Sequence, residues 1–403
     1  MTTGRQDVIK EDSSSPADPF DFGGGHVVPN AAVNPGLIYE AGKQNYEAFL
    51  CGLNSDVIDD TACELLVAEG YPTEAGNLNQ PSIAISALVS ERTVTRSVTN
   101  VGDAAVFTAA IETPPGIAVS VTPETLSLNP GESADYDITL AMAGAEPGIW
   151  QFGAITWNSS DHSARSPIAA RMIEFLTPLE VTGTGASGNL SFDIEFGYTG
   201  AYTAMAQGLT APTVIADLTV TDDSDNTYVQ VPLDQQMPDF IWRSPVDMVT
   251  TTADDTLLRV ALFDESTAGD DDLDLYVYYC PTTLTCDAPW FSGNYDSNEQ
   301  IDIVLPKPGN YLIDVHGFNT EAASTTFDLF VWTVGSGDNP GNLTMTAPGV
   351  ATVGTTAEVA LSWVGLETQT HLGTVSHSNG EGDPEITVIE IQNPPEEIVT
   401  EDP

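Results

Sequence analysis

The residues with the most evident chemical potential are histidines that have acidic or hydroxyl neighbours. His162 lies between Asp161 and Ser163, and His26 follows three glycines in GGGHVVPN. Serine hydrolases combine these side-chain types in their catalytic triads. Residues adjacent on one hairpin turn cannot converge on a single substrate atom, and a glycine cluster is typical of a tight turn. We therefore interpret both histidines as turn residues.

A second candidate is the acidic segment FDESTAGDDDLDLYVY. Two-residue alternation would turn Asp272 and Asp274 outward, near a loop that holds Asp264. Calcium binds six to eight hard oxygen ligands, so these carboxylates are candidate calcium ligands. The spacing is not that of an EF-hand, and a solvated acidic loop is the alternative. The side chains expected to face the core are Leu273, Leu275, Val277 and Tyr279.

Two further groups of residues have chemical potential. His371 and His377 fall on one face of an unbroken strand, but a metal ion would need a third ligand, such as Asp383, and nothing fixes one there. Trp290, Phe291 and Tyr295 follow the last cysteine and are the best candidates for an exposed aromatic surface, as in modules that bind polysaccharide. Their alternative is ordinary packing.

The four cysteines fall into two close pairs, Cys51 with Cys63 and Cys280 with Cys286. Pairing by proximity predicts two local disulfides, which indicate an exported protein. Free thiols in a reducing cytosol are the alternative. The cysteines form no cluster with histidine at zinc spacing.

The chain has 403 residues, and 59 acidic against 10 basic side chains give a net charge of −49. So few dispersed cations exclude binding to a nucleic-acid backbone and disfavour anionic membranes. The hydrophobic fraction, 41%, is that of a folded protein. Calcium sites or a salty extracellular setting would explain the acidity, and the scattered acidic residues favour the salty setting.

Hydrophobic periodicity predicts a mainly β protein built from tandem β-sandwiches. Residues 1–72 are rich in loops, with short helices at residues 44–53 and 62–70. Short alternating runs follow, separated by Gly, Pro, Asn and Asp. The predicted β domains are 77–174, 178–335 and a small module at 340–393, before a disordered tail at 394–403.

The order of motifs resembles the C-terminal portion of subtilisin-like serine proteases of the plant-type branch. The motifs are MTTG, ADPFDFGGGHVVPNAAVNPGLIYEAG, NYEAFLCGL, TVTRSVTNVGD, PPGIAVSVTPETLSL, FGAITW and HSARSPIAAR. The resemblance implies that residues 1–72 close an α/β catalytic domain and that a fibronectin-III-like sandwich follows. Cys51 and Cys63 also fall where that branch often has a cysteine pair. Residues 178–335 are similar to the prepeptidase C-terminal domains of secreted bacterial proteases.

The motifs that carry the aspartate, histidine and serine of a subtilisin-type site are not found in this sequence. The resemblance implies that they lie upstream, together with any signal peptide, and that Met1 is an internal methionine of a longer reading frame. The chain alone should then be inactive. We expect no catalytic or cofactor-binding residues here, calcium aside, and expect the missing catalytic domain as its partner.

The predicted function is a non-catalytic C-terminal part of a secreted endopeptidase, whose distal β modules provide targeting or solubility. A stand-alone extracellular module that binds a polymer or a cell surface is the alternative. No nucleophile–base or metal constellation supports an unrelated enzyme. Apolar residues of the N-terminal segment discriminate the protease part from the stand-alone module, because a complete protease core would bury them. In the isolated chain, the protease hypothesis predicts that residues 1–50 are poorly ordered. The apolar residues include Phe20, Phe22, Leu37, Ile38 and Tyr39.

Overall fold

The structure is a computed structural model, and it describes residues 1–53, 57–282, 285–335, 337 and 340–393. These residues form two compact units, the first of which consists of Met1–Leu176 and two short later stretches. The predicted disordered tail, 394–403, lies outside the described residues. No helix in the described part of the chain is long and apolar enough to cross a membrane.

The α-helices that the structure describes all lie near the N-terminus. Asp18 accepts a hydrogen bond from the Phe20 amide where the first helix begins, and Asp59 caps the last helix in the same way. Both predicted helices are present. The elements are α1 (Pro19–Phe22), α2 (Pro29–Ala32), α3 (Lys43–Gly52), α4 (Asp60–Ala68) and the 3-10 turn η1 (Ala75–Asn77).

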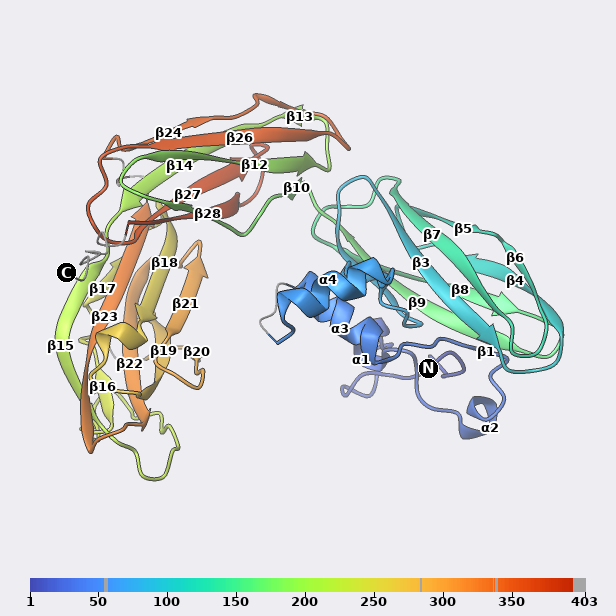
Figure 1. The fold of residues 1–403 in the computed structure, drawn as a ribbon, viewed down its shortest axis with the longest axis horizontal. Helices are drawn as coiled ribbons and strands as arrows, with labels where there is room; N and C mark the ends of the chain where they lie inside the picture. The colour runs from blue at the N-terminus through green and yellow to red at the C-terminus, as the bar shows by residue number, and fades with distance from the viewer. Residues whose placement is uncertain (54–56, 283–284, 336, 338–339, 394–403) are drawn as a thin grey trace, which may run out of the picture. The chain divides into compact units, whose positions relative to one another are not determined.

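Two sheets packed face to face follow in the first unit (Figure 1), with strand orders β1-β3-β7-β5 and β2-β9-β8-β4-β6. Every second residue of β7, from Tyr136 to Leu140, is buried between them, so the predicted β-sandwich is confirmed. The strands are β1 (Leu37–Ile38), β2 (Ile83–Leu88), β3 (Glu91–Asn100), β4 (Ala105–Glu112), β5 (Ile117–Thr122), β6 (Thr125–Leu128), β7 (Ser133–Met142), β8 (Trp150–Asn158) and β9 (Ser163–Met172). The short β10 (Phe175–Leu176) belongs to neither sheet and pairs with β12 (Gly188–Phe196).

The second unit begins and ends with the strands of one sandwich. Its β11 runs parallel to β28, and its β14 runs antiparallel to β27. β26 separates β12 from β24 in the facing sheet. The strands are β11 (Glu180–Thr184), β12 (Gly188–Phe196), β13 (Gly200–Ala201), β14 (Thr203–Thr210), β24 (Leu343–Thr346), β25 (Val350–Ala351), β26 (Thr356–Trp363), β27 (His371–Ser378) and β28 (Glu385–Gln392).

This pairing corrects the predicted division into a domain at 178–335 and a separate module at 340–393. Strands from both predicted domains complete one core, and another sandwich is inserted between them in sequence. Trp363 of β26 donates its indole N–H to the Gly185 carbonyl (2.9 Å), and a Cβ on Gly188 would lie 2.4 Å from its ring. Without β11 and β12, this tryptophan would lose its cover.

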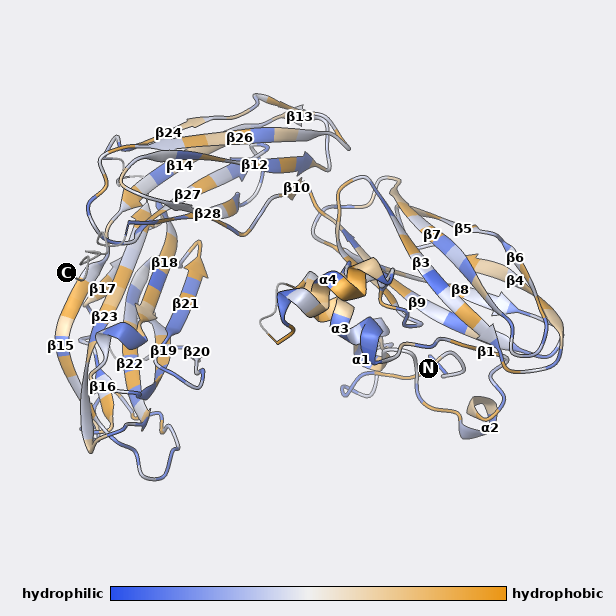
Figure 2. Ribbon diagram, in the orientation of Figure 1, coloured by the Kyte–Doolittle hydropathy of each residue, from blue (hydrophilic) through white to orange (hydrophobic). Residues whose placement is uncertain are grey.

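The inserted sandwich has the strand orders β15-β23-β18-β21 and β16-β22-β19-β20, and β17 also pairs with β22. In Figure 2, apolar residues concentrate along its central strands. Its elements are β15 (Thr213–Thr221), β16 (Ile241–Arg243), β17 (Val249–Thr251), β18 (Asp255–Leu262), η2 (Asp264–Ser266), β19 (Asp272–Cys280), β20 (Trp290–Ser292), β21 (Glu299–Val304), β22 (Gly309–Asn319) and β23 (Ser324–Gly335).

The two sandwiches of the second unit share a buried junction. The Thr256 hydroxyl lies 2.8 Å from the Gln207 amide oxygen and 2.7 Å from the Thr374 hydroxyl, so β18 is hydrogen-bonded to β14 and β27. An apolar cluster surrounds these polar contacts, and the junction is therefore built like a protein core. The buried members of the cluster are Leu257, Ala261, Trp332, Val334, Leu372 and Val388.

Candidate functional site

The N-terminal segment is anchored on the fibronectin-like sandwich by β1. Leu37 is fully buried in the sandwich core, and it pairs with Asn100 of β3. The Tyr39 hydroxyl lies 2.7 Å from that of Tyr136 and 2.8 Å from that of Ser166. Burial, reinforced by Tyr136, raises the pKa of Tyr39 well above its ordinary value.

These contacts correct one expectation from the sequence. Leu37 and Tyr39 do not require a catalytic core to cover them, because the sandwich already does so. Ile38 belongs to the same paired strand and is half-buried. Within the N-terminal segment, the residues before and after β1, and not those of β1 itself, are therefore the ones that could present apolar side chains to another domain.

The rest of the segment exposes large apolar side chains. Phe20 packs edge-on against Trp150 and Phe152, with ring centroids 4.9 and 5.3 Å away, yet it stays 59% exposed. Phe22 is half-buried. Monomeric proteins seldom leave this many large apolar residues open in one segment, and such surfaces mark contacts with other protein. The others, between 54% and 83% exposed, are Met1, Ile9, Val27, Val33, Leu53, Val57, Leu65 and Val67.

Both histidines interpreted as turn residues lie in turns or bridges. The backbone of His26 pairs with Arg5, through two hydrogen bonds of 2.9 and 3.0 Å. His162 lies in the β8–β9 hairpin, where its amide donates to the Ser159 hydroxyl. The ring packs against Gly36, because a Cβ there would come within 2.6 Å of His162. Neither geometry joins a hydroxyl nucleophile to an imidazole base.

The three candidate calcium ligands have separate surroundings. Asp264 accepts a hydrogen bond from the Ser297 amide (3.1 Å), while Asp274 lies 3.2 Å from the His316 ring. Asp272 keeps one buried oxygen without a partner, and burial, then the charges of Asp274 and Asp296, raise its pKa to about 6. Among the residues that the structure describes, no group of three or more His, Cys, Asp or Glu side chains is arranged to hold a metal ion.

The burial of Asp274 corrects the expectation that it faces solvent. Leu273, Leu275 and Val277 face the core as predicted, but Asp274 is only 7% exposed on the other face of β19. Tyr228, from the loop between β15 and β16, packs over this face. A loop from elsewhere in the chain thus buries a residue that alternation places on the outside.

His316 of β22 is a buried residue that the sequence motifs did not single out. Its ring nitrogens lie 2.9 Å from Asp223 and 3.2 Å from Asp274. Burial alone would lower the pKa of His316, but hydrogen bonds to Asp274 and Asp223 outweigh it and raise the pKa. The sequence does contain a pattern that indicates this buried site. In YLIDVHGF, the ionisable residues Asp314 and His316 are two apart and so share one face of an otherwise apolar strand.

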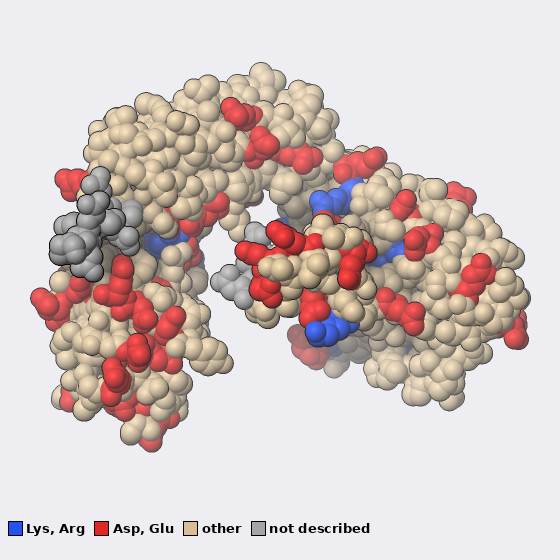
Figure 3. Space-filling model, viewed as in Figure 1, with Lys and Arg blue, Asp and Glu red and all other residues tan. Residues whose placement is uncertain are grey.

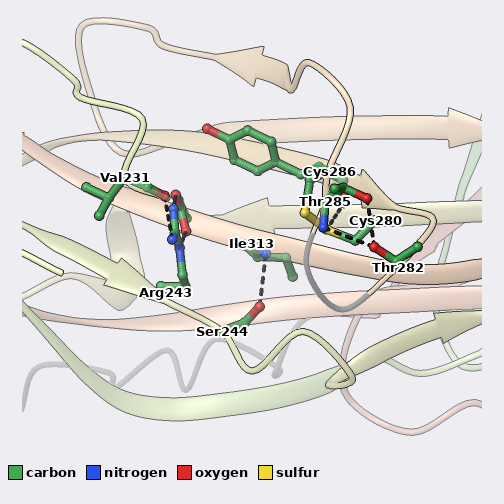
Figure 4. The surroundings of a disulfide bond; sticks show 10 residues. Val231, Arg243, Ser244, Cys280, Thr282, Thr285, Cys286 and Ile313 are labelled. Carbon is green, nitrogen blue, oxygen red and sulfur yellow. Dashed lines mark hydrogen bonds and ion pairs between the residues drawn. A yellow bond between two sulfur atoms is a disulfide. The ribbon is translucent and has the colours of Figure 1, made fainter. Parts of the chain in front are cut away.

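A charged network next to this histidine holds the covering loop. The Arg243 guanidinium makes two hydrogen bonds to the Asp314 carboxylate, of 2.6 and 2.7 Å, and a third to the Val231 carbonyl. The Tyr228 hydroxyl donates to the same carboxylate (2.7 Å). Figure 4 shows Arg243 reaching Val231 across the sheet, and Ser244 bonded to the Ile313 amide.

The cysteines are bonded as Cys51–Cys63 and Cys280–Cys286, and no free cysteine is present among the described residues. The first bond joins α3 to α4, with 5.7 Å between the Cα atoms. The second closes a loop at the end of β19, close to Thr282 and Thr285 (Figure 4), and the chain then leads into β20.

Next to that loop lies the β20 aromatic surface, which consists of Trp290, Phe291 and Tyr295. These residues are 39%, 57% and 102% exposed, and β20 is an edge strand. Behind them, Phe291 lies 4.8 Å from the ring of Tyr276, which stacks on Tyr228 at 3.7 Å. Phe291 therefore rests on an ordered aromatic stack, whereas Trp290 lies on the other face of β20, with its ring 6.2 Å from that of Tyr311.

The other histidines considered as metal ligands have protein partners. His377 is buried between the Tyr202 hydroxyl (2.7 Å) and the Thr387 hydroxyl (3.1 Å), and burial lowers its pKa to about 4. His371 bonds to the Gln369 carbonyl, and Asp383 is exposed. Both rings serve the packing of β27.

Comparisons with known proteins find sequence relatives of the first unit. A family model described as a fibronectin type-III domain matches residues 77–170. Subtilisin-like protease SBT3.11 of Arabidopsis thaliana is 38% identical over 162 residues, which cover 38% of this chain and 21% of the relative. Subtilisin-like protease SBT5.4 of the same plant is 36% identical over 183 residues, which cover 43% and 23%.

The first unit therefore contains a fibronectin type-III domain. In sequence this region is similar to the C-terminal, fibronectin-III-like part of subtilisin-like proteases. The chain spans about a fifth of the length of these relatives. Among solved structures, the secreted serine protease VesC from Vibrio cholerae matches with a TM-score of 0.20 and 8% sequence identity. The match covers 63% of this chain and 48% of that one.

Proposed function

We propose that the chain serves a secreted subtilisin-like endopeptidase in two ways. The first unit supports the catalytic domain, and the second unit contributes β modules for targeting and solubility. The observation that carries the first role is the set of exposed apolar residues between Met1 and Val67. The sequence similarity to subtilisin-like proteases extends over 162 to 183 residues, which is more than the 77–170 of the fibronectin type-III match.

Energetics favour a protein partner for this surface. Burying one large aliphatic side chain contributes about 1.5–3 kcal/mol, so even a few such contacts would hold a domain in place. β1 fixes the segment to the sandwich, and Phe20 rests on the sandwich through Trp150. A catalytic domain seated on the segment would therefore be coupled to the sandwich through residues that are already ordered.

Limited proteolysis of the isolated chain tests this arrangement. We expect cleavage within residues 1–34, where backbone pairing is sparse, and protection from Leu37 onward, where β1 joins the sheet. N-terminal sequencing of the trimmed product reads out the boundary. In a Leu37→Ala variant the boundary should move past Tyr39, since a core anchor is lost.

The matched control is Val33→Ala, because Val33 is 83% exposed and should leave the boundary unchanged. Full protection of residues 1–34 in the wild-type chain would contradict the proposal. That result would favour a self-sufficient extracellular binding module, the alternative function.

The targeting role rests on the β20 aromatic surface. Aromatic side chains are enriched at the energetically dominant positions of binding interfaces. Phe291 projects from β20 and rests on the Tyr228–Tyr276 stack, and Tyr295 projects from the loop that follows β20. The proposed ligand is the polymeric substrate surface, protein or polysaccharide, on which the parent protease works.

The proposed setting is extracellular. Two disulfides are stable in an oxidising compartment, and the net charge of −49 keeps a protein soluble in concentrated salt. Figure 3 shows Asp and Glu distributed over the visible surface, with few Lys or Arg between them. The distribution fits general solubility better than one localised charge-based binding site.

A further inference from the structure

A cavity of about 450 Å³ lies within the second unit, at the junction of its two sandwiches. One wall is aromatic and comes from β23 and the end of β18. Phe263 packs edge-on against Phe330, with centroids 5.0 Å apart, and Phe330 stacks on Trp332 at 6.1 Å. The Trp332 indole N–H faces the Thr370 carbonyl (3.4 Å), so the polar atom of that ring has a protein partner.

Next to the aromatic wall, on the same pair of strands, lies one guanidinium that is surrounded by an excess of carboxylates. Arg259 of β18, 2% exposed, bonds Asp302 through Nε (2.6 Å), Glu390 through Nη1 (2.6 Å) and Glu180 through Nη2 (2.5 Å). One positive charge faces three negative charges, and two carboxylates, Glu390 of this network and Glu265, line the cavity itself. The site is thus negative although an arginine lies at its centre.

The titration of Glu180 reflects this imbalance. Burial raises its pKa, and the charges of Glu390 and Asp302 raise it further, which outweighs the lowering effect of Arg259. A second cation near these carboxylates would relieve the repulsion.

The amide side chains of the lining strengthen the acceptor character. Gln300 donates to Asp302 (3.0 Å), and Gln392 donates to Glu390 (2.7 Å), so both amides are oriented by the acidic cluster. Their carbonyl oxygens add neutral acceptors to the charged ones. An anionic ligand would meet repulsion here, whereas an ammonium or guanidinium group would find acceptors beside aromatic faces.

We propose that this cavity binds a cationic side chain, lysine or arginine, of a peptide ligand. The charged end would lie against Glu265 and Glu390, and the aliphatic stem would lie against Phe263 and Phe330. A saccharide fits less well, because the indole that would serve as its stacking platform, Trp332, is only 2% exposed. The two phenylalanines meet edge-to-face and offer no continuous flat surface.

The test is calorimetric titration of the full chain with Nα-acetyl-L-arginine amide, compared with the neutral Nα-acetyl-L-norleucine amide. We expect arginine amide to bind at least about tenfold more tightly at low salt, with the difference shrinking in high salt, because the attraction is electrostatic. N-acetylglucosamine serves as the saccharide probe.

Variants locate the binding. Glu265→Gln removes an exposed carboxylate, and Phe330→Ala opens the aromatic wall; each should weaken arginine amide binding by about fivefold or more. Asp193→Asn, an exposed acid on β12 outside the lining, is the control and should change nothing. Because Glu265 lies on the surface, its variant keeps the test valid even if Phe330→Ala does not fold.

Three results would overturn the proposal. They are an equal affinity for the arginine and norleucine amides, the absence of arginine amide binding at millimolar concentration, and an unchanged affinity in Glu265→Gln. Binding of N-acetylglucosamine alone would assign the cavity to a saccharide instead.

Discussion

His316 shows, at the scale of single residues, how an acidic chain stabilises a buried charge. Both ring nitrogens face carboxylates, and no water-exposed surface remains on the side chain. Asp223 and Asp274 therefore favour the imidazolium form of the ring and raise its pKa, although burial opposes them. Asp272, Asp296 and Glu299 add further negative charge on the neighbouring elements.

This pair of contacts predicts how stability depends on pH. The pKa of His316 is raised in the folded state, so its contribution is complete below the unfolded value of about 6.5 and is lost as the pH rises through the folded value. Urea unfolding between pH 6 and 9 should show stability falling by up to about 1.4 kcal/mol per pH unit in that window.

His316→Gln should flatten that slope, whereas the exposed His26→Gln should leave it unchanged. Asp272 also makes the stability fall as the pH rises, but at lower pH. Its pKa of about 6 in the folded state exceeds the ordinary value of about 3.9, so the folded state holds this proton more tightly. A wild-type stability that rises between pH 6.5 and 9 would show that the carboxylates do not hold the imidazolium.

Sequence reasoning at this scale found some residues and missed others. The exposed Phe291 and Tyr295 were expected, because they lie in a loop beside a cysteine pair. His316 and Arg259 were not, because their partners come from strands or loops far away in sequence. An arginine inside TLLRVALF is itself a signal, since a charge in a buried strand requires counter-ions.

Strand pairing is the feature of the elements that the sequence predicted least well. Alternation located most strands, since each pattern is local. The partners were wrong in the second half, because the pattern of β11 to β14 does not encode that their neighbours lie beyond residue 342. The fibronectin-like sandwich was predictable because its strands follow one another without an insertion.

The β20 edge carries a prediction at the same scale. Changing Trp290, Phe291 and Tyr295 together to alanine should reduce retention of the chain on insoluble protein or polysaccharide by roughly tenfold or more, as loss of an aromatic hot spot does. Co-sedimentation measures the bound fraction. The control is Leu179→Ala, an apolar residue 85% exposed elsewhere in the second unit.

Equal retention of the triple variant and the wild-type chain would remove the targeting role from this surface. Loss of retention in Leu179→Ala as well would indicate non-specific apolar adsorption.

The whole molecule contains a first unit that is similar to part of subtilisin-like proteases and a second unit with its own architecture. Its negative charge is carried by residues spread over many elements, and the cations Arg243 and Arg259 are paired with carboxylates beside them. The buried junction makes the second unit's two sandwiches one body, so ligand contacts at the β20 aromatic surface and in the cavity would belong to the same unit.

The central claim is that this chain works as part of a subtilisin-like protease. The most direct measurement is the coding sequence upstream of Met1. The account predicts one continuous reading frame that encodes the aspartate, histidine and serine motifs of a subtilisin-type catalytic domain. An in-frame stop codon just before Met1, with no protease-coding sequence further upstream, would contradict it.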